Sequence, residues 1–191
     1  METTDRIFRI IVIGGSAGSI PVVRKILSAL PSTFHIPVVI CLHRLTDIKA
    51  GLVEALETNS SIKVLEPDDK IPVKAGYAYV APANYHLLIE PAHTFALSID
   101  EKVNFSRPAI DLTFETSGLA YRRSMLGIIL SGANMDGARG LYQAHKNGAY
   151  TIVQDPEESL VRTMPEKALE TFNPDATLNS DEIIKLLNTL K

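Results

Sequence analysis

Ser16 occupies the position that a nucleophilic serine takes in a Gly-x-Ser-x-Gly turn. The residues before it, Ile10–Ile13, are apolar and β-favouring, as in a strand buried on both faces. A helix is expected after it, at 22–30. A tight turn between a parallel strand and a helix exposes the serine hydroxyl, and the N–H of Ala17 would point at a developing oxyanion.

The same glycine-rich turn has two other interpretations. Dinucleotides also bind at a glycine-rich turn after a first strand, and GGSAGS is close to that type. However, the spacing G-x-G-x-x-G is absent, and no Asp or Glu occurs from Arg6 to Thr46, where the ribose-binding acid would stand. Alternatively, the glycines serve only helix–strand packing, and the turn alone does not decide between these possibilities.

Two other polar residues follow apolar strands. His43 comes directly after the apolar run 36–42, and Asp136 lies in a glycine-bearing loop after the run 127–130. A surface histidine and an aspartate that caps a helix are the simpler interpretations of each residue alone. Carboxyl ends of parallel strands share one edge of a sheet, so both residues can converge on Ser16. A serine needs a base, and the base needs an acceptor, so the three predict a Ser-His-Asp triad.

The order Ser, His, Asp argues against the α/β-hydrolase family, in which the order is Ser, Asp, His. Strands and helices alternate along most of the chain, which predicts a three-layer α/β/α fold with a doubly wound, mainly parallel sheet. The four short strands expected between Ile62 and Ile99 have no helices between them and predict an antiparallel or mixed extension that includes a hairpin. We expect residues 1–191 to form a single domain.

Composition excludes several classes of protein. Of the 191 residues, 46% are hydrophobic, which argues against disorder, and the net charge of −3 makes nucleic acid an unexpected partner. Cys41 is the only cysteine, and the other histidines (His35, His86, His93 and His145) show no metal-ligand spacing, so no metal or cofactor is expected. The N-terminus does not resemble a signal peptide and no uncharged apolar run is long enough to span a bilayer. We therefore expect a cytoplasmic protein with no membrane insertion.

Several linked motifs carry a resemblance to a known family. They are IIVIGGSAG, CLHR, GYAYVAPANYHLLI, FSRPAIDLTF, GIILSGANMDGARG and VQDPEESLVRTMPEKA, in this order over nearly the whole chain. In these motifs the sequence resembles the methylesterase domain of the chemotaxis protein-glutamate methylesterases (CheB). The resemblance implies that Ser16 is the nucleophile, His43 the general base and then acid, and Asp136 the orienting carboxylate.

The resemblance also implies a substrate and partners. The substrate would be a glutamate γ-methyl ester on the cytoplasmic helices of a chemoreceptor, and members of the family also deamidate receptor glutamines. Other chemotaxis or sensory signalling proteins would be further partners. The family commonly carries a receiver domain ahead of the esterase; this chain begins a few residues before its first strand, so we expect no receiver domain and activity without phosphorylation.

The resemblance is not uniform around the triad. The family usually has Thr at the position of Ala17, and its loop before the aspartate usually reads G-M-G-x-D where 132–136 reads GANMD. We take Ala17, Ala133 and Met135 as candidates for the oxyanion and substrate site. Arg107 is a candidate for meeting an acidic receptor surface, or else a solvated arginine. These departures leave open the alternative of a binding or regulatory module with weak or no activity.

Overall fold

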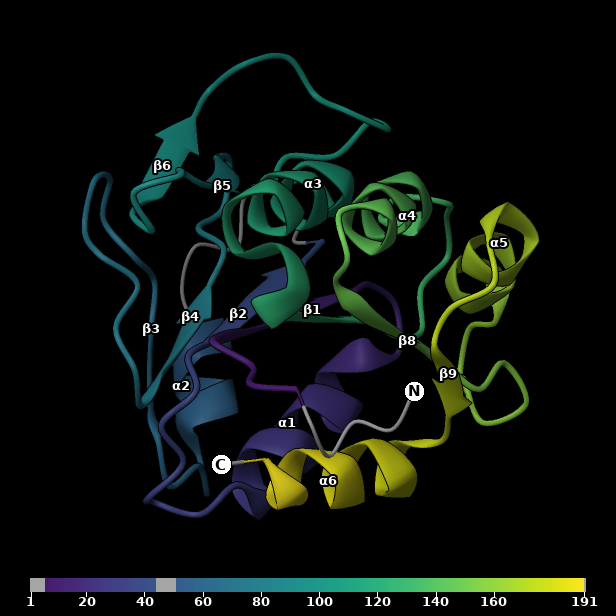
Figure 1. Ribbon diagram of the computed structural model, residues 1–191, viewed down its shortest axis with the longest axis horizontal. Helices are drawn as coiled ribbons and strands as arrows, with labels where there is room; N and C mark the ends of the chain where they lie inside the picture. Colours follow the sequence, from purple (N-terminus) through teal and green to yellow (C-terminus); the bar gives the residue numbers. More distant parts are fainter. Residues whose placement is uncertain (1–5, 44–50, 191) are drawn as a thin grey trace.

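A parallel sheet of seven strands forms the centre of the protein. The computed structural model describes residues 6–43 and 51–190, with helices on both faces of the sheet (Figure 1). The strand order is β3-β4-β2-β1-β7-β8-β9, and each neighbouring pair is parallel. The strands of this sheet are β1 (Ile10–Gly15), β2 (Val38–Leu42), β3 (Lys63–Leu65), β4 (Tyr77–Val80), β7 (Met125–Ile129), β8 (Tyr150–Gln154) and β9 (Ala176–Leu178).

Helices cover the sheet in two layers with a hydrophobic core under each. Ile11 and Ile13 of β1 pack into the core under α1, α2 and α6, whereas Ile10 and Val12 pack into the core under α3, α4 and α5 (Figure 1). This alternation is the period of two of a strand buried on both faces. The helices are α1 (Ser19–Ala29), α2 (Leu52–Glu57), α3 (Ile110–Tyr121), α4 (Ala138–Lys146), α5 (Thr163–Thr171) and α6 (Ser180–Thr189), with a 3₁₀ turn η2 (Arg122–Ser124) after α3.

Helices α3 and α4 approach each other unusually closely. A Cβ added to Gly140 would lie 2.2 Å from the carbonyl oxygen of Asp111, and one added to Gly118 would lie 2.6 Å from Cα of Ala144. Contacts this short leave no room for a side chain, so glycine at both positions lets the two backbones touch. The close packing brings the start of α3 against the loop that precedes α4.

The predicted three-layer fold is confirmed, with one correction. The pair β5 (His86–Ile89) and β6 (Phe95–Ser98) is antiparallel, as expected. The expectation that β3 and β4 also belong to an antiparallel or mixed extension is wrong, because both join the main sheet as parallel strands. The connection 66–76 holds no helix but is long enough to return the chain to the same end of the sheet.

Some details also differ from what the sequence pattern predicts. The pattern predicts a helix at 48–59, and the structure describes α2 from Leu52, while residues 48–50 lie outside the described part of the chain. The pattern also predicts a helix from Arg107 through Ala120, but α3 begins at Ile110, because the segment before it forms an irregular loop. Strand β9 was not predicted, since three residues at the sheet edge leave little pattern to detect. Within the described ranges, no helix has both the length and the apolarity needed to cross a membrane.

Candidate active site

Ser16, His43 and Asp136 follow three strands that are neighbours in the sheet, with β1 between β2 and β7. The amide of His43 donates to the carbonyl of Gly15 at 3.3 Å, and the amide of Ser16 donates to the carbonyl of Ser131 at 2.9 Å. Neighbouring strands lie about 4.8 Å apart, so Ser16 and His43 start from adjacent backbone positions. The sheet therefore brings the three residues to one edge.

His43 and Asp136 are joined by a short hydrogen bond. Nε2 of His43 lies 2.7 Å from Oδ2 of Asp136, whose side chain is completely buried, while the His43 side chain is 13% exposed. With Nε2 directed to the carboxylate, Nδ1 is the ring nitrogen left to face a reacting group. A buried acceptor on one nitrogen fixes the tautomer of the other, which is what a general base requires.

Asp136 is held by hydrogen-bond donors on both carboxylate oxygens. Oδ2 also accepts from the amide of Ile110 at 2.7 Å, and Oδ1 accepts from the amide of Asp111 at 3.1 Å and from Nδ2 of Asn104 at 2.9 Å. The two amides belong to the first turn of α3, where the helix dipole favours a negative charge. Asp136 therefore does not cap its own helix, α4, whose N-cap is Gly137.

The donors around Asp136 outweigh its burial. Burial is the largest single effect and raises the pKa of a carboxyl group, but hydrogen bonds from His43, Asn104 and the amide of Ile110 together hold the pKa of Asp136 below its ordinary value. Asp136 is thus an anion at neutral pH, and it can stabilise a positive charge that forms on His43.

Asp111 mirrors this arrangement from the other helix. Its Oδ1 accepts from the amides of Gly137 and Gly140 at 2.9 and 2.7 Å, around the start of α4, and its Oδ2 accepts from Nδ2 of Asn104 at 3.0 Å. Each acid is thus bound by amides at the start of the other's helix, and Asn104 bridges the two. Burial raises the pKa of Asp111, and the negative charge of Asp136 adds to that effect. No sequence pattern pointed to Asn104, because it lies in an irregular loop.

Ser16 stands beside the imidazole without a hydrogen bond to it. Among the described residues, no such bond joins Ser16 to His43, although both side chains are partly exposed and neighbours at the strand ends. Ser19 holds the turn by donating from Oγ to the carbonyl of Ser16 at 2.6 Å, and Gly18 rather than Ser19 is the N-cap of α1, with φ of 84°. Hydrogen bonds between a catalytic serine and its base are often long or poorly aligned before substrate binds.

Two exposed residues, Ala17 and Ala133, lie in or beside the serine turn. Within residues 6–43 and 51–190, the amides of Ala17 and Ala133 have no hydrogen-bond acceptor in the protein. Ser131 ties these segments together, because its Oγ donates to the carbonyl of Ala17 at 2.7 Å and accepts from the amide of Val161 at 2.9 Å. Such free amides on a braced backbone are suited to bind an oxyanion.

The other two candidates differ in their surroundings. Met135 is 60% exposed beside Asp136. Arg107 is directed to its own loop, since its Nη1 donates to the carbonyls of Ile99 and Asp100 at 2.6 and 2.9 Å. These bonds tie the segment after β6 to the residues just before α3, which include Asn104.

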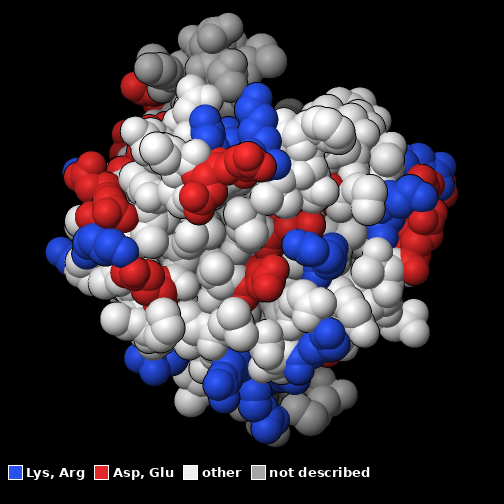
Figure 2. All heavy atoms as spheres, turned by 90° about the horizontal axis from the view of Figure 1, so that it is seen from above, with Lys and Arg blue, Asp and Glu red and all other residues white. Residues whose placement is uncertain are grey.

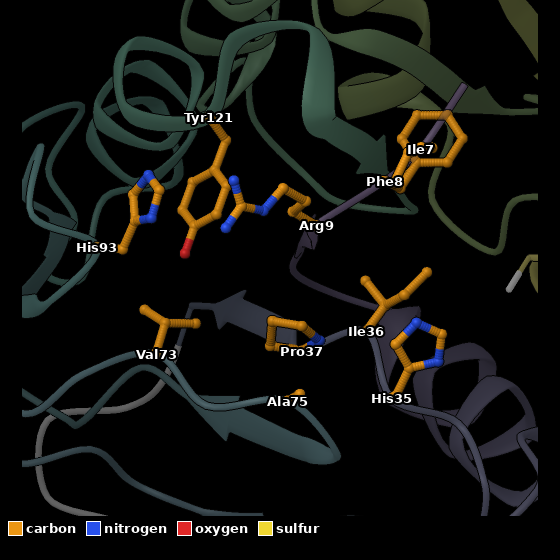
Figure 3. A pocket seen from close by; sticks show the side chains of 10 residues that line it. All are labelled: Ile7, Phe8, Arg9, His35, Ile36, Pro37, Val73, Ala75, His93 and Tyr121. Carbon is orange, nitrogen blue, oxygen red and sulfur yellow. The ribbon is translucent and has the colours of Figure 1, made fainter. Parts of the chain in front are cut away.

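A cavity of about 300 Å³ lies elsewhere, at the amino ends of β1 and β2 (Figure 3). It is lined by Ile7, Phe8, Arg9, His35, Ile36, Pro37, Val73, Ala75, His93 and Tyr121. The ring of His93 stacks on Tyr121 at 4.1 Å between centroids. Strand β1 separates this cavity from Ser16 by roughly 20 Å. In the part of the chain that the structure describes, no group of His, Cys, Asp and Glu side chains could hold a metal ion.

Comparisons with known proteins agree on one family. The model of the CheB methylesterase family matches residues 11–187. A relative from Leptospira interrogans, named for protein-glutamate methylesterase and protein-glutamine glutaminase activities, is 44% identical over 179 residues, which cover 94% of this chain and 93% of the relative. A protein-glutamate methylesterase/protein-glutamine glutaminase from Symbiobacterium thermophilum is 33% identical over 85% of this chain and 45% of its own length. The crystal structure of the Thermotoga maritima CheB methylesterase catalytic domain superposes with a TM-score of 0.90 at 30% identity, covering 95% of this chain and 98% of that domain.

Proposed function

The chain belongs to the CheB methylesterase family, a family of hydrolases, and from this premise we propose that it removes methyl groups from glutamate γ-methyl esters of chemoreceptors through Ser16, His43 and Asp136. The observation that carries the proposal is the 2.7 Å bond between His43 and the buried Asp136, at the same sheet edge as Ser16. That the ester lies on chemoreceptor helices is inferred from the resemblance of the sequence motifs to the family.

The reaction would proceed in two halves. Ser16 Oγ attacks the ester carbonyl while Nδ1 of His43 takes its proton, and the amides of Ala17 and Ala133 bind the oxyanion that forms. Collapse of this intermediate breaks the bond to the methoxy group, which takes the proton from His43 and leaves as methanol. A water molecule, deprotonated by His43, then attacks the glutamyl–Ser16 ester, and the products are a glutamate carboxylate and free Ser16.

Asp136 would act only through His43. The imidazole becomes an imidazolium each time it holds a proton, and the adjacent carboxylate stabilises that charge. Four donors hold this carboxylate in place, and the bonds from His43, Asn104 and the amide of Ile110 keep its pKa low. The proton therefore remains on His43 during the reaction.

The same residues can deamidate glutamine, which is the second activity in the names of the relatives. Attack of Ser16 on a side-chain amide gives the same glutamyl ester, with ammonia as the leaving group in place of methanol. The amine must be protonated as it leaves, and His43 would supply that proton.

Methanol release from a methylated chemoreceptor tests the proposal. Wild type should release methanol, and Ser16→Ala should not, with the fold of the variant checked by circular dichroism. Turnover retained by Ser16→Ala would overturn the mechanism.

A second candidate function is binding without catalysis. It is favoured by the absence of a Ser16–His43 hydrogen bond in the described part of the chain. A fluorophosphonate probe separates the two functions, because it reacts with an activated serine and not with one that is merely exposed.

A further inference from the structure

Three large apolar side chains are exposed on loops that are bonded either to Asp136 or to Ser131, which is itself bonded to the serine turn. They are Phe105, Met135 and Leu160, which are 96%, 60% and 79% exposed. We refer to these three side chains as the apolar rim. A single exposed apolar side chain is common, but three of them on these adjoining loops need an explanation.

A tight turn holds Phe105 outward next to Asp136. Val103 and Ser106 exchange backbone hydrogen bonds of 3.2 and 2.9 Å, so the turn between them is closed. Asn104 points inward to Asp136, while Phe105, with φ of 62°, points to solvent. The left-handed region is rare for a bulky residue, and such conformations cluster at functional sites.

The other two members of the rim, Met135 and Leu160, also lie next to candidate site residues. Met135 immediately precedes Asp136. The side chain of Leu160 lies over the serine turn, because a Cβ on Gly18 would be 2.7 Å from Leu160 Cβ. The next residue, Val161, bonds to Ser131 and Gly132 through its amide and carbonyl. The rim thus comes from three separate loops that meet at the site.

The loop between β6 and α3 lies at the top of Figure 1. The face seen from above carries Lys and Arg close to Asp and Glu among uncharged residues, so it shows no extended patch of one sign (Figure 2). The apolar rim instead offers surface whose burial would contribute binding energy.

We propose that the apolar rim binds apolar side chains that flank the methylated glutamate of the protein substrate. The inference rests on the proposed function, since a protein that delivers its ester to Ser16 must cover the surrounding loops. A small ester reaches Ser16 without covering the rim. The rim would thus raise affinity for the protein substrate and leave the chemical step unchanged.

The test compares two substrates with one double variant, Phe105→Asn/Leu160→Ala. Asparagine tolerates the left-handed conformation, so the turn at Phe105 is kept. We expect kcat/KM for a methylated receptor fragment to fall at least about tenfold, mainly through KM, as for the loss of contact hot spots. The value for p-nitrophenyl acetate should change less than about twofold. Leu119→Ala, at a site 55% exposed on α3, is the matched control and should change neither value.

Binding provides a readout that does not depend on turnover. In a Ser16→Ala background, adding Phe105→Asn and Leu160→Ala should weaken binding of the receptor fragment by a similar factor in calorimetry. If the wild type hydrolyses neither substrate, the proposed function fails, and this binding result still tests the rim. Equal losses on both substrates, or no loss on the receptor fragment, would overturn the inference. A self-association in sedimentation that the double variant abolishes, with receptor binding unchanged, would assign the rim to a second copy and overturn it as well.

Discussion

Replacing Asp136 with asparagine tests whether this carboxylate acts on His43. Each carboxylate oxygen accepts two hydrogen bonds, from His43 and Ile110 on one side and from Asn104 and Asp111 on the other. In Asp136→Asn an NH₂ group replaces one oxygen. If it faces Asn104 and Asp111, two donors lose their acceptor; if it faces His43 and Ile110, the imidazole can change tautomer and accept from it, so only the amide of Ile110 loses its acceptor. A buried unsatisfied donor costs about 1–3 kcal/mol, so the free energy of unfolding should fall by roughly 1–6 kcal/mol.

The loss of activity should exceed what this destabilisation explains. If Asp136 only capped a helix, Asp136→Asn would cost little stability, because asparagine caps about as well as aspartate; the four donors change that expectation. In a serine protease triad the same change costs about 10⁴-fold, so we expect a drop in kcat of at least about 10²-fold. Rates are measured on p-nitrophenyl acetate at a temperature where urea titration shows the variant to be folded.

Asp111→Asn is the matched control. Asp111 is only 3% exposed and accepts bonds from Gly137, Gly140 and Asn104, but it makes no contact with His43. We expect a similar loss of stability and a loss of activity below about tenfold, since this residue acts only by positioning. Full activity in Asp136→Asn would remove Asp136 from the triad, and equal losses in both variants would show that packing alone is responsible.

Four further results are expected from the structure. On acidification Asp111 should bind its proton at a higher pH than Asp136, because their pKa values are shifted in opposite directions; carboxyl ¹³C NMR would show the order, and a reversed order would contradict the donor arrangement. The stability that Asp136 contributes should be present above its unfolded pKa of about 3.9 and be lost as pH falls through its lower folded value. Gly140→Ala should lower the free energy of unfolding by about 1–3 kcal/mol in urea titration, because its Cβ meets the backbone of Asp111; an unchanged midpoint would refute the close approach. Cys41 is buried with its pKa raised to about 12, so a thiol reagent should label it only after unfolding, and rapid labelling of the native protein would contradict that burial.

The sequence was informative where local pattern and sheet geometry agree. Buried parallel strands are continuous apolar runs, so the runs 10–13 and 127–130 could be found directly, and each ends at a known edge of the sheet. The same rule places Ser16, His43 and Asp136 together. It does not specify the direction of β3 and β4, because a connection without a helix can lead either way.

The residues that hold Asp136 in place could not be predicted in this way. Asn104 and Asp111 reach Asp136 from positions 32 and 25 residues away, through a loop and a helix start. No periodicity marks such contacts. They depend on the close approach of α3 and α4. Two glycines permit this approach, but their presence in the sequence does not predict it.

Covalent labelling of Ser16 tests the central claim most directly. Wild type is treated with a fluorophosphonate probe, and the labelled residue is identified by peptide mass spectrometry. We predict labelling at Ser16 that is lost in Ser16→Ala and falls strongly in His43→Ala, because only the base makes the serine reactive. Ser16 left unlabelled by a probe shown to reach the site, or labelled equally well without His43, would contradict it.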